Sequence, residues 1–331
     1  MVTDFKKKQK KELEQKKSRK KPETKVRGNP KVVFWFLLTT IILSGIFWFK
    51  SNFSSFWQQL MEPARYEFVN PEVVDKKLLQ LTRKLKTQDD VVSGIGELTR
   101  ELSGTYGVYV YELEKDESYG VNDDLVFTAA SVNKVPIMVA LLQEIEKGRL
   151  TFEDQYGLQK KDIQDYGTGS MRYDRLGTVY TYNDLLELSG KKSDNTAAYV
   201  LSKIVGERKL GNLMASLEMK NTSIEDNITT PEEMGWLFVE LYKGRLLKNE
   251  FREKFYGYLT NTDFEDRIPM GAPDIIAVMH KIGSEIGVIN DCGIVFETNP
   301  YVLCILSKNV KEAEALEVLP KISRLVWEYE K

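Results

Sequence analysis

Histidine and cysteine are nearly absent from this chain, and their scarcity excludes several kinds of active site. Its 331 residues include one histidine, His280, and two cysteines. A Ser–His–Asp triad would depend on His280 alone. The neighbouring Lys281 is the better candidate for a cleft, because alternation along a strand sends the two side chains to opposite faces. The spacing of a metal site and a glycine-rich phosphate loop are both missing, so we expect no metal and no cofactor. A catalytic base would have to be lysine, aspartate or glutamate.

Positive charge is concentrated at the N-terminus. Residues 1–31 carry a net charge of +9 and the remainder carries −11, which together give the formal −2 of the whole chain. So polar a tail cannot pack a core, and we expect it to be disordered and cytoplasmic. A basic tail can bind nucleic acid, but an apolar run follows it directly, so we expect no nucleic-acid partner.

The apolar run predicts a membrane anchor. Residues 32–49 are uncharged and mostly apolar, which is enough to span a bilayer at the low end of the usual range. The basic residues before it place the N-terminus in the cytoplasm. No small-residue cleavage site follows, so we expect an uncleaved signal anchor over 32–50 and a linker over 51–75. Residues 76–331 would then form the extracytoplasmic domain of a single-pass protein of the cell membrane.

Beyond residue 75, strands are predicted at both ends of the chain and helices between them. This order predicts an α+β fold, in which an antiparallel sheet of about five strands is built from both chain ends and flanked by terminal helices. An all-helical lobe (128–249) would be inserted into the sheet part (76–127 and 250–331). Helical spacing covers 73–85, 90–102, 151–242 and 310–330; strand patterns cover 107–113, 118–121, 275–283, 289–296 and 301–306; turn residues include 290–291 and 298–300. Pro320 would kink or divide the last helix.

A candidate nucleophile stands at the start of a very apolar helix. Ser131 precedes Lys134 by three residues, and residues 137–145 are nearly all apolar, which indicates a buried helix. Residues three apart share a helix face, so the lysine amine can reach the serine hydroxyl. A serine beside a lysine in an apolar setting is typical of an activated nucleophile. The Ser-x-x-Lys pattern alone is weak, since it recurs at 18–21 and 189–192.

Two further motifs strengthen this assignment. Ser193-Asp194-Asn195 lies between two helical runs, so its side chains are predicted in an exposed loop facing Ser131. Asp194 is also a good candidate for a helix N-cap. The second motif, 280–284, lies on a strand, where Gly283 would let a ligand approach the backbone closely.

In this order and context, the three motifs resemble those of the penicillin-recognising serine enzymes, and class A β-lactamases most closely. The resemblance covers roughly residues 76–331 and implies a β-lactamase/transpeptidase-like fold. It is supported by four further stretches: 127–136, 142–150, 229–231 and 266–269.

The resemblance implies a covalent mechanism. Ser131 would be the nucleophile that forms an acyl-enzyme, and a neutral Lys134 would accept its proton. Burial and the like charge of Lys281 would both lower the pKa of Lys134. Ser193 would relay a proton to the leaving nitrogen, with Lys281 close to it.

The resemblance also implies how a substrate is held. Asn195 would bind the substrate amide, and Lys281 would attract the substrate carboxylate beside Gly283. The backbone N–H groups of Ser131 and Ser284 would form the oxyanion hole.

Two departures from the family pattern bear on activity. Ile282 stands where the family usually has a hydroxyl residue, which removes one donor to the substrate carboxylate; Ser284 is a candidate to compensate. The long loop with the deacylating glutamate is missing, since 219–228 runs almost straight into Thr229. Glu225 is the remaining candidate for that base.

We therefore expect a membrane-anchored, class A β-lactamase-like serine hydrolase that acts on β-lactams or related amides and deacylates slowly. Two alternatives stay open at this point: a penicillin-binding peptidase with a peptidoglycan-type peptide substrate, and a non-catalytic, wall-binding protein with a degenerate site. Cys292 and Cys304 flank a predicted hairpin symmetrically. They are interpreted either as a disulfide or as two buried apolar cysteines.

Overall fold

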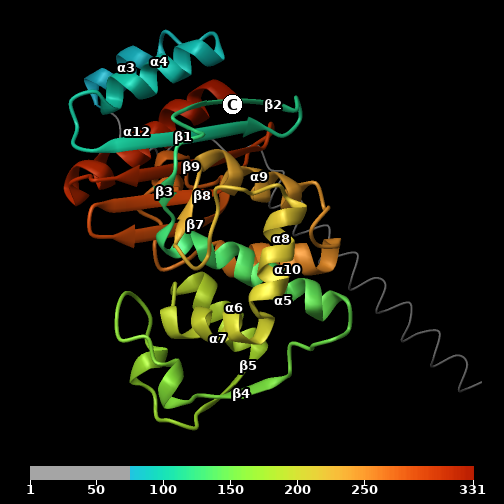
Figure 1. Ribbon diagram of the computed structural model, residues 1–331. Helices are drawn as coiled ribbons and strands as arrows, with labels where there is room; N and C mark the ends of the chain where they lie inside the picture. The colour runs from blue at the N-terminus through green and yellow to red at the C-terminus, as the bar shows by residue number, and fades with distance from the viewer. Residues whose placement is uncertain (1–74) are drawn as a thin grey trace, which may run out of the picture. The chain divides into compact units, whose positions relative to one another are not determined.

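Residues 75–331 are the part of the chain that the structure, a computed structural model, describes. Their main feature is a five-stranded antiparallel sheet in the order β2-β1-β9-β8-β7 (Figure 1). Its strands are β1 Thr105–Glu112, β2 Glu117–Val121, β7 Ala277–Glu285, β8 Val288–Phe296 and β9 Tyr301–Lys308. Because β1 pairs with β9 along its whole length, the sheet is built from both chain ends. This confirms the predicted α+β class.

The first and last helices cover one face of the sheet (Figure 1). They are α3 Lys76–Thr82, α4 Gln88–Thr99 and α12 Glu312–Glu330. Leu78, Ile95 and Leu325 from these helices pack into one apolar cluster with Val108 and Ile305 of the sheet. The helix α12 continues through Pro320 as one element, so it is not divided there.

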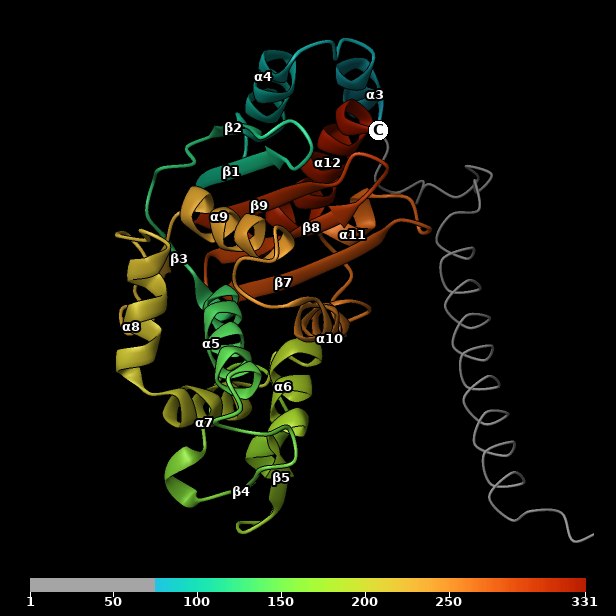
Figure 2. The ribbon, with the colours of Figure 1, turned by 90° about the vertical axis from the view of Figure 1, so that its right-hand side faces the viewer.

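The other face of the sheet is covered by the middle of the chain (Figure 2). The helix α5 is buried almost throughout, as its apolar run predicts, and α9 packs on β1 and β9. Met138 and Phe238 from these two helices share an apolar cluster with Cys292 and Cys304 of the sheet. The helices on this side are α5 Lys134–Glu146, α6 Tyr182–Lys191, α7 Asn195–Val205, α8 Glu207–Ser216, α9 Pro231–Tyr242 and α10 Asn249–Leu259.

Local sequence explains where several helices begin. A capping box between Thr87 and Asp90 starts α4, and Thr181 with Asp184 does the same for α6. Thr230 accepts a hydrogen bond from a backbone N–H of α9, whose first residue is a proline.

The segment 151–181 was predicted helical, and this prediction is wrong. It contains the short strands β4 Gln155–Gly157 and β5 Val179–Thr181, with two 3-10 turns between them, Lys160–Asp162 and Met171–Tyr173. The buried Asp162 accepts hydrogen bonds from the Tyr156 hydroxyl and the Gln159 backbone, and it forms an ion pair with Lys203. The contacts with Tyr156 and Gln159 are local and offer the backbone an alternative to a helix, and the ion pair with Lys203 fixes the segment from a distance.

The predicted turn at residues 290–291 is also wrong. Both residues lie inside β8, and the chain turns instead at 286–287, where Gly287 has a φ of 73°. Asn290 and Asp291 are polar because they bond to buried groups: Asn290 to the Thr128 carbonyl and the Ser307 N–H, Asp291 to the Ile268 N–H.

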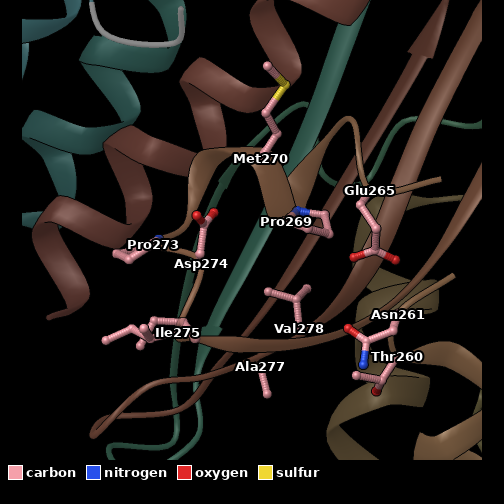
Figure 3. Close-up of a pocket in the computed structure, with 11 residues that line it drawn as sticks. Thr260, Asn261, Glu265, Pro269, Met270, Pro273, Asp274, Ile275, Ala277 and Val278 are labelled. Atoms are coloured by element: carbon pink, nitrogen blue, oxygen red, sulfur yellow. The ribbon is translucent and has the colours of Figure 1, made fainter. Parts of the chain in front are cut away.

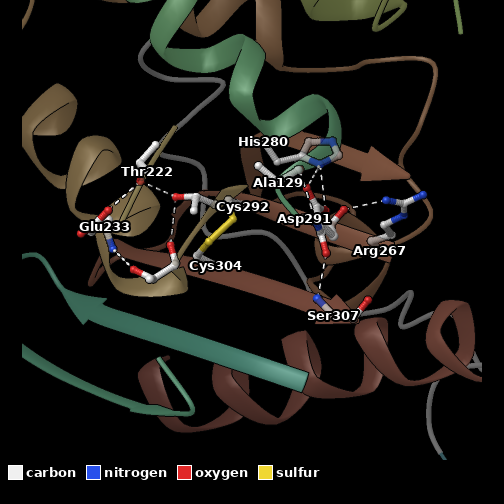
Figure 4. The surroundings of a disulfide bond; sticks show 12 residues. Ala129, Thr222, Glu233, Arg267, His280, Asp291, Cys292, Cys304 and Ser307 are labelled. Carbon is white, nitrogen blue, oxygen red and sulfur yellow. Dashed lines mark hydrogen bonds and ion pairs between the residues drawn. A yellow bond between two sulfur atoms is a disulfide. The ribbon is translucent and has the colours of Figure 1, made fainter. Parts of the chain in front are cut away.

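Cys292 and Cys304 form a disulfide (Figure 4). They lie directly opposite each other on β8 and β9, and both are fully buried. Of the two interpretations offered by the sequence, the structure therefore favours the pair.

Within residues 75–331, no helix combines the length and the hydropathy that a membrane crossing requires. The predicted tail (1–31), the anchor (32–50) and nearly all of the linker (51–75) lie outside the described residues.

Candidate active site

Ser131 lies in a 3-10 turn, Ala130–Asn133, immediately before α5 rather than in the first turn of that helix. The preceding Ala130 has a φ of 50°, a left-handed conformation that costs an L-residue about 1–2 kcal/mol. Such strain persists only where neighbours hold the backbone in place. Here Ala129 donates its N–H to the Asn227 carbonyl at 2.8 Å, and Asn290 donates to the Thr128 carbonyl at 2.8 Å.

The edge strand β7 passes directly against this turn. A Cβ atom on Gly283 would lie 2.7 Å from the Ala129 carbonyl oxygen and 3.1 Å from the Ala130 Cβ. A side chain at this position would therefore push the turn away. We predicted that Gly283 admits a ligand; in the structure, the group that approaches it closely is the turn that carries Ser131.

Lys134 is buried beside this turn. Its Nζ donates to the Asn195 Oδ1 at 2.6 Å, to the Ser193 Oγ at 3.2 Å and to the Ser193 carbonyl. Burial lowers the pKa of Lys134 to about 7, against the attraction of the Asp194 carboxylate. An ammonium group has three donors, and these contacts use all of them. No hydrogen bond joins Lys134 to the Ser131 hydroxyl in the described part of the chain, so the contact predicted between these two side chains is not formed in this structure.

Ser193 lies between the two lysines. Lys281 is fully buried, and its Nζ donates to the Ser193 Oγ at 2.8 Å. Burial, and then the like charge of Lys134, lower the pKa of Lys281 well below its usual value. A hydroxyl has two acceptor positions, and the two lysines occupy both. The Ser193 proton therefore points away from the lysines.

The loop that carries Ser193 and Asn195 is held from both sides. Ser193 has a φ of 52°, and Asp194 caps α7 by accepting from the Ala197 N–H at 3.0 Å, which confirms the N-cap prediction. The Asn195 amide donates to the Tyr166 carbonyl at 3.0 Å. One of its two N–H donors remains for a ligand.

Ser284 follows Gly283 and is exposed. Its Oγ accepts a hydrogen bond of 2.6 Å from the guanidinium of Arg267, which is buried and also donates to the Gly283 carbonyl at 3.0 Å. Because Arg267 can only donate, the Ser284 hydroxyl must direct its own proton elsewhere. Ile282 is buried and supplies no donor, so the exposed Ser284 hydroxyl is the donor that this end of β7 presents.

The segment where a long loop was predicted missing is a tight hairpin, closed by the bridge between Ser223 and Ile228. Glu225 is exposed near its tip, and among residues 75–331 its side chain makes no hydrogen bond or ion pair. Its neighbour Asp226 is engaged with Ser223. The structure therefore leaves Glu225 unconstrained, and its role as a base stays a prediction.

His280 and Lys281 have different partners, as strand alternation predicts. His280 is buried, and its Nδ1 lies 2.8 Å from Asp291 (Figure 4). Its Nε2 lies 3.3 Å from Glu265. Burial opposes a charge on the ring, but the attraction of Asp291 and then of Glu265 raises the pKa of His280 to about 9. His280 is thus a buried ion-pair partner and does not take part in a triad with Ser131.

A pocket of about 440 Å³ lies near the start of β7, where Glu265, Asn261 and Asp274 surround an apolar floor that includes Val278 (Figure 3). None of the predicted site residues lines it. Its connection to the site is indirect, since Glu265 contacts His280.

Three residues of the site escaped the sequence interpretation. Asn290 anchors the turn that carries Ser131, Arg267 orients Ser284, and Asn227 contacts Ala129. Arg267 lies in one of the stretches that supported the family resemblance, which was the available signal. Asn290 is of a residue type that is common in turns, so the sequence suggested a turn there. Nothing in the sequence around Asn227 indicates that it contacts the site.

Comparisons with known proteins identify relatives of this chain. A family model described as "Beta-lactamase enzyme family" matches residues 90–329. Beta-lactamase VEB-1 of Pseudomonas aeruginosa is 24% identical over 271 residues, which cover 73% of this chain and 90% of that protein. A beta-lactamase of Rhodobacter capsulatus is 25% identical over 206 residues, 57% of this chain and 70% of that protein.

Solved structures share the fold. The L158E mutant of PBP-A, in an acyl-enzyme complex with penicillin-G, shares 25% sequence identity with this chain, and the two structures superpose with a TM-score of 0.68. The match covers 73% of this chain and 98% of the PBP-A chain. The beta-lactamase from Sphaerobacter thermophilus is 24% identical with a TM-score of 0.68, covering 73% of this chain and 97% of that chain. Side chains of all three motifs meet at the Ser193 hydroxyl. Because the family model also matches most of the described residues, the chain belongs to the beta-lactamase enzyme family.

Proposed function

We propose that this protein is a serine enzyme that β-lactams or related amides acylate at Ser131, and that the acyl-enzyme deacylates slowly. The observation that carries the proposal is the position of the Ser193 hydroxyl between two buried lysines, 2.8 Å from Lys281 and 3.2 Å from Lys134. Few roles other than proton transfer explain two buried amines with lowered pKa values around one hydroxyl.

Acylation proceeds in two steps. The neutral amine of Lys134 removes the proton of Ser131, whose Oγ attacks the amide carbonyl to form a tetrahedral oxyanion. The backbone N–H groups of Ser131 and Ser284 stabilise that charge. The intermediate collapses as the carbon–nitrogen bond breaks. Ser193 gives its proton to the leaving nitrogen and recovers one from the lysines beside it.

The substrate carboxylate is held at the end of β7. The loss of a hydroxyl at Ile282 is offset by Ser284, whose proton is directed away from Arg267, and by the charges of Arg267 and Lys281.

Slow deacylation follows from the short hairpin at 223–228. Hydrolysis of the ester needs a base aimed at a water molecule, and the hairpin offers only the unconstrained Glu225. The PBP-A mutant that is similar to this chain was captured as an acyl-enzyme with penicillin-G, which supports a family member whose adduct persists. A second candidate, a peptidase that acts on peptidoglycan-type peptides and that β-lactams acylate, would also carry a persistent adduct. A non-catalytic, wall-binding protein would not need the two buried lysines.

The proposal includes a location. Residues 32–50 anchor the protein in the cell membrane, with the N-terminus in the cytoplasm and the enzyme outside, where peptidoglycan-type substrates are found. The support is the +9 tail next to an apolar run. Protease added to spheroplasts should digest the 76–331 domain, and a domain that stays protected while the tail is cut would refute this orientation.

The test of acylation is labelling by a fluorescent penicillin. The wild-type protein should carry a covalent label that survives denaturation, and Ser131→Ala should carry none while keeping the wild-type melting temperature. An unlabelled wild-type protein would contradict both enzyme proposals. If labelling occurs, mass spectrometry of the products from a β-lactam and from a peptidoglycan-type peptide distinguishes the first candidate from the second.

A further inference from the structure

We infer that Asn227 is a positioning residue, which ties the turn that carries Ser131 to the end of β7 that carries Ser284. It would thereby hold the two backbone N–H groups of the oxyanion hole at their working separation. The inference rests on the proposed acyl transfer at Ser131.

Asn227 bonds to both sides of the site. Its backbone carbonyl accepts the Ala129 N–H at 2.8 Å, two residues before Ser131. Its side-chain Oδ1 accepts from the Asn133 amide at 3.4 Å, two residues after Ser131. Its Nδ2 donates to the Glu285 carboxylate at 2.8 Å, one residue after Ser284. Asn227 thus makes two contacts with the segment 129–133, which carries Ser131, and one contact with β7.

The partners determine the orientation of this amide. An ionised Glu285 can only accept, so it requires the Nδ2 of Asn227, and the Oδ1 then faces Asn133. The Asn133 amide also donates to the Ser223 carbonyl at 3.2 Å, which fixes its own orientation. The contacts form one polarised chain of donors and acceptors from β7 to the turn.

The backbone at this position also favours asparagine. Asn227 has a φ of 55°, a left-handed conformation that asparagine adopts more readily than most residues. The hairpin that carries Asn227 is closed by the bridge between Ser223 and Ile228.

Two contacts act on this turn from opposite directions. Asn290 attaches the turn to the interior of the sheet through the Thr128 and Ala129 carbonyls. Asn227 attaches it to the exposed end of β7. Loss of Asn227 should therefore leave the domain folded and alter the alignment of the two donors. Because an oxyanion exists only after attack, such a change should slow acylation more than it weakens initial binding.

The test replaces the donor of the contact between Asn227 and Glu285 by a second acceptor. In Asn227→Asp, the new carboxylate still accepts from Asn133 but repels Glu285. We expect the acylation rate constant for a fluorescent penicillin, measured by stopped flow, to fall about 10–100-fold. The constant for initial binding should change by roughly twofold at most.

Glu285→Gln should act as a rescue. Alone, it keeps an acceptor for Asn227 and should acylate at nearly the wild-type rate. Combined with Asn227→Asp, its amide can donate to the new carboxylate and should restore most of the lost rate, which a merely structural role would not do. Asn261→Asp is the matched control, since Asn261 is also left-handed (φ 52°) and lies outside the site.

Each outcome decides the proposal. Wild-type acylation by Asn227→Asp, or a loss that Glu285→Gln fails to rescue, would overturn it. If Asn227→Asp does not fold, Asn227→Gly keeps the left-handed backbone and should show the same selective loss of rate. If the wild-type protein is never acylated, that result contradicts the proposed function but does not decide the role of Asn227.

Hydrogen exchange then tests Asn227 separately. Asn227→Gly should speed amide exchange in residues 129–133, and unchanged exchange would contradict the positioning role of Asn227.

Discussion

The amine of Lys281 lies 2.8 Å from the hydroxyl oxygen of Ser193, although the lysine side chain is only 1% exposed and has no carboxylate in direct contact within the described residues. A buried amine without a counter-ion is unfavourable for folding, because its charged form loses hydration. Its persistence here indicates a functional requirement rather than a contribution to stability. The predictions below test the groups around this contact.

Ser193→Ala removes the hydroxyl that would carry the proton to the leaving nitrogen. A positioned acid or base contributes roughly 10²–10⁴-fold to a rate, so we expect acylation to fall by that factor. Fluorescent-penicillin kinetics would measure it. The control is Ser189→Ala, four residues away, because the Ser189 hydroxyl is buried without a hydrogen-bond partner in the described structure. Equal rates for the two variants would remove Ser193 from the mechanism.

The acylation rate should rise with pH through about 7. Burial lowers the pKa of Lys134 to about 7, and only the neutral amine has a lone pair to accept the Ser131 proton. Below that pH the ammonium form predominates and the rate should fall about tenfold per pH unit. Single-turnover acylation between pH 5 and pH 9 provides the measurement, and a flat profile would mean that another group accepts the proton.

His280→Gln should destabilise the domain in a pH-dependent way. Removing one partner of a buried ion pair costs about 3–5 kcal/mol, which urea unfolding at pH 6 would detect. Asp291 and Glu265 raise the pKa of His280 to about 9, despite burial, from an ordinary 6.5. The stabilisation is therefore complete below pH 6.5 and is lost as the pH rises through 9. The difference between wild type and variant should shrink over that window, and a constant difference would contradict a charged His280.

The acyl-enzyme should persist. In the proposed mechanism, Ser131 and Lys134 serve acylation, whereas deacylation lacks a constrained base. Intact-protein mass spectrometry long after mixing should show most of the protein carrying one β-lactam. Glu225→Gln should change this little. Rapid turnover without a detectable adduct, abolished by Glu225→Gln, would instead identify Glu225 as the missing base.

Much of the fold could be predicted because apolar spacing reports burial directly. The buried helix after Ser131 and the terminal strands follow from such patterns. The segment 151–181 was assigned wrongly because its structure depends on contacts of the buried Asp162. One partner is Tyr156 within the segment, and the other is Lys203 on the helix α7. Such polar contacts, whether local or between distant residues, have no periodic signature in the sequence.

Short motifs predicted which side chains of the candidate site lie together. Lys134, Ser193, Asn195 and Lys281 come together as the motifs indicate. The residues that position them are distant in sequence and chemically ordinary. Asn290, for example, holds the Ser131 turn through carbonyls some 160 residues earlier, and nothing local distinguishes it from a turn residue.

The pairing of β1 with β9 also determines when this domain can fold. Thr105 at the start of β1 lies opposite Lys308 at the end of β9, and the hydroxyl of Tyr119 reaches Glu330, 211 residues later. Contacts of such high sequence separation make folding slow, because a long loop must close before they form. Until β9 is available, β1 exposes an unpaired edge of the kind that promotes aggregation. A chain truncated before about residue 308 lacks a complete β9. We therefore expect proteases to degrade it, and we expect no partial activity, although the turn that carries Ser131 is present in its sequence.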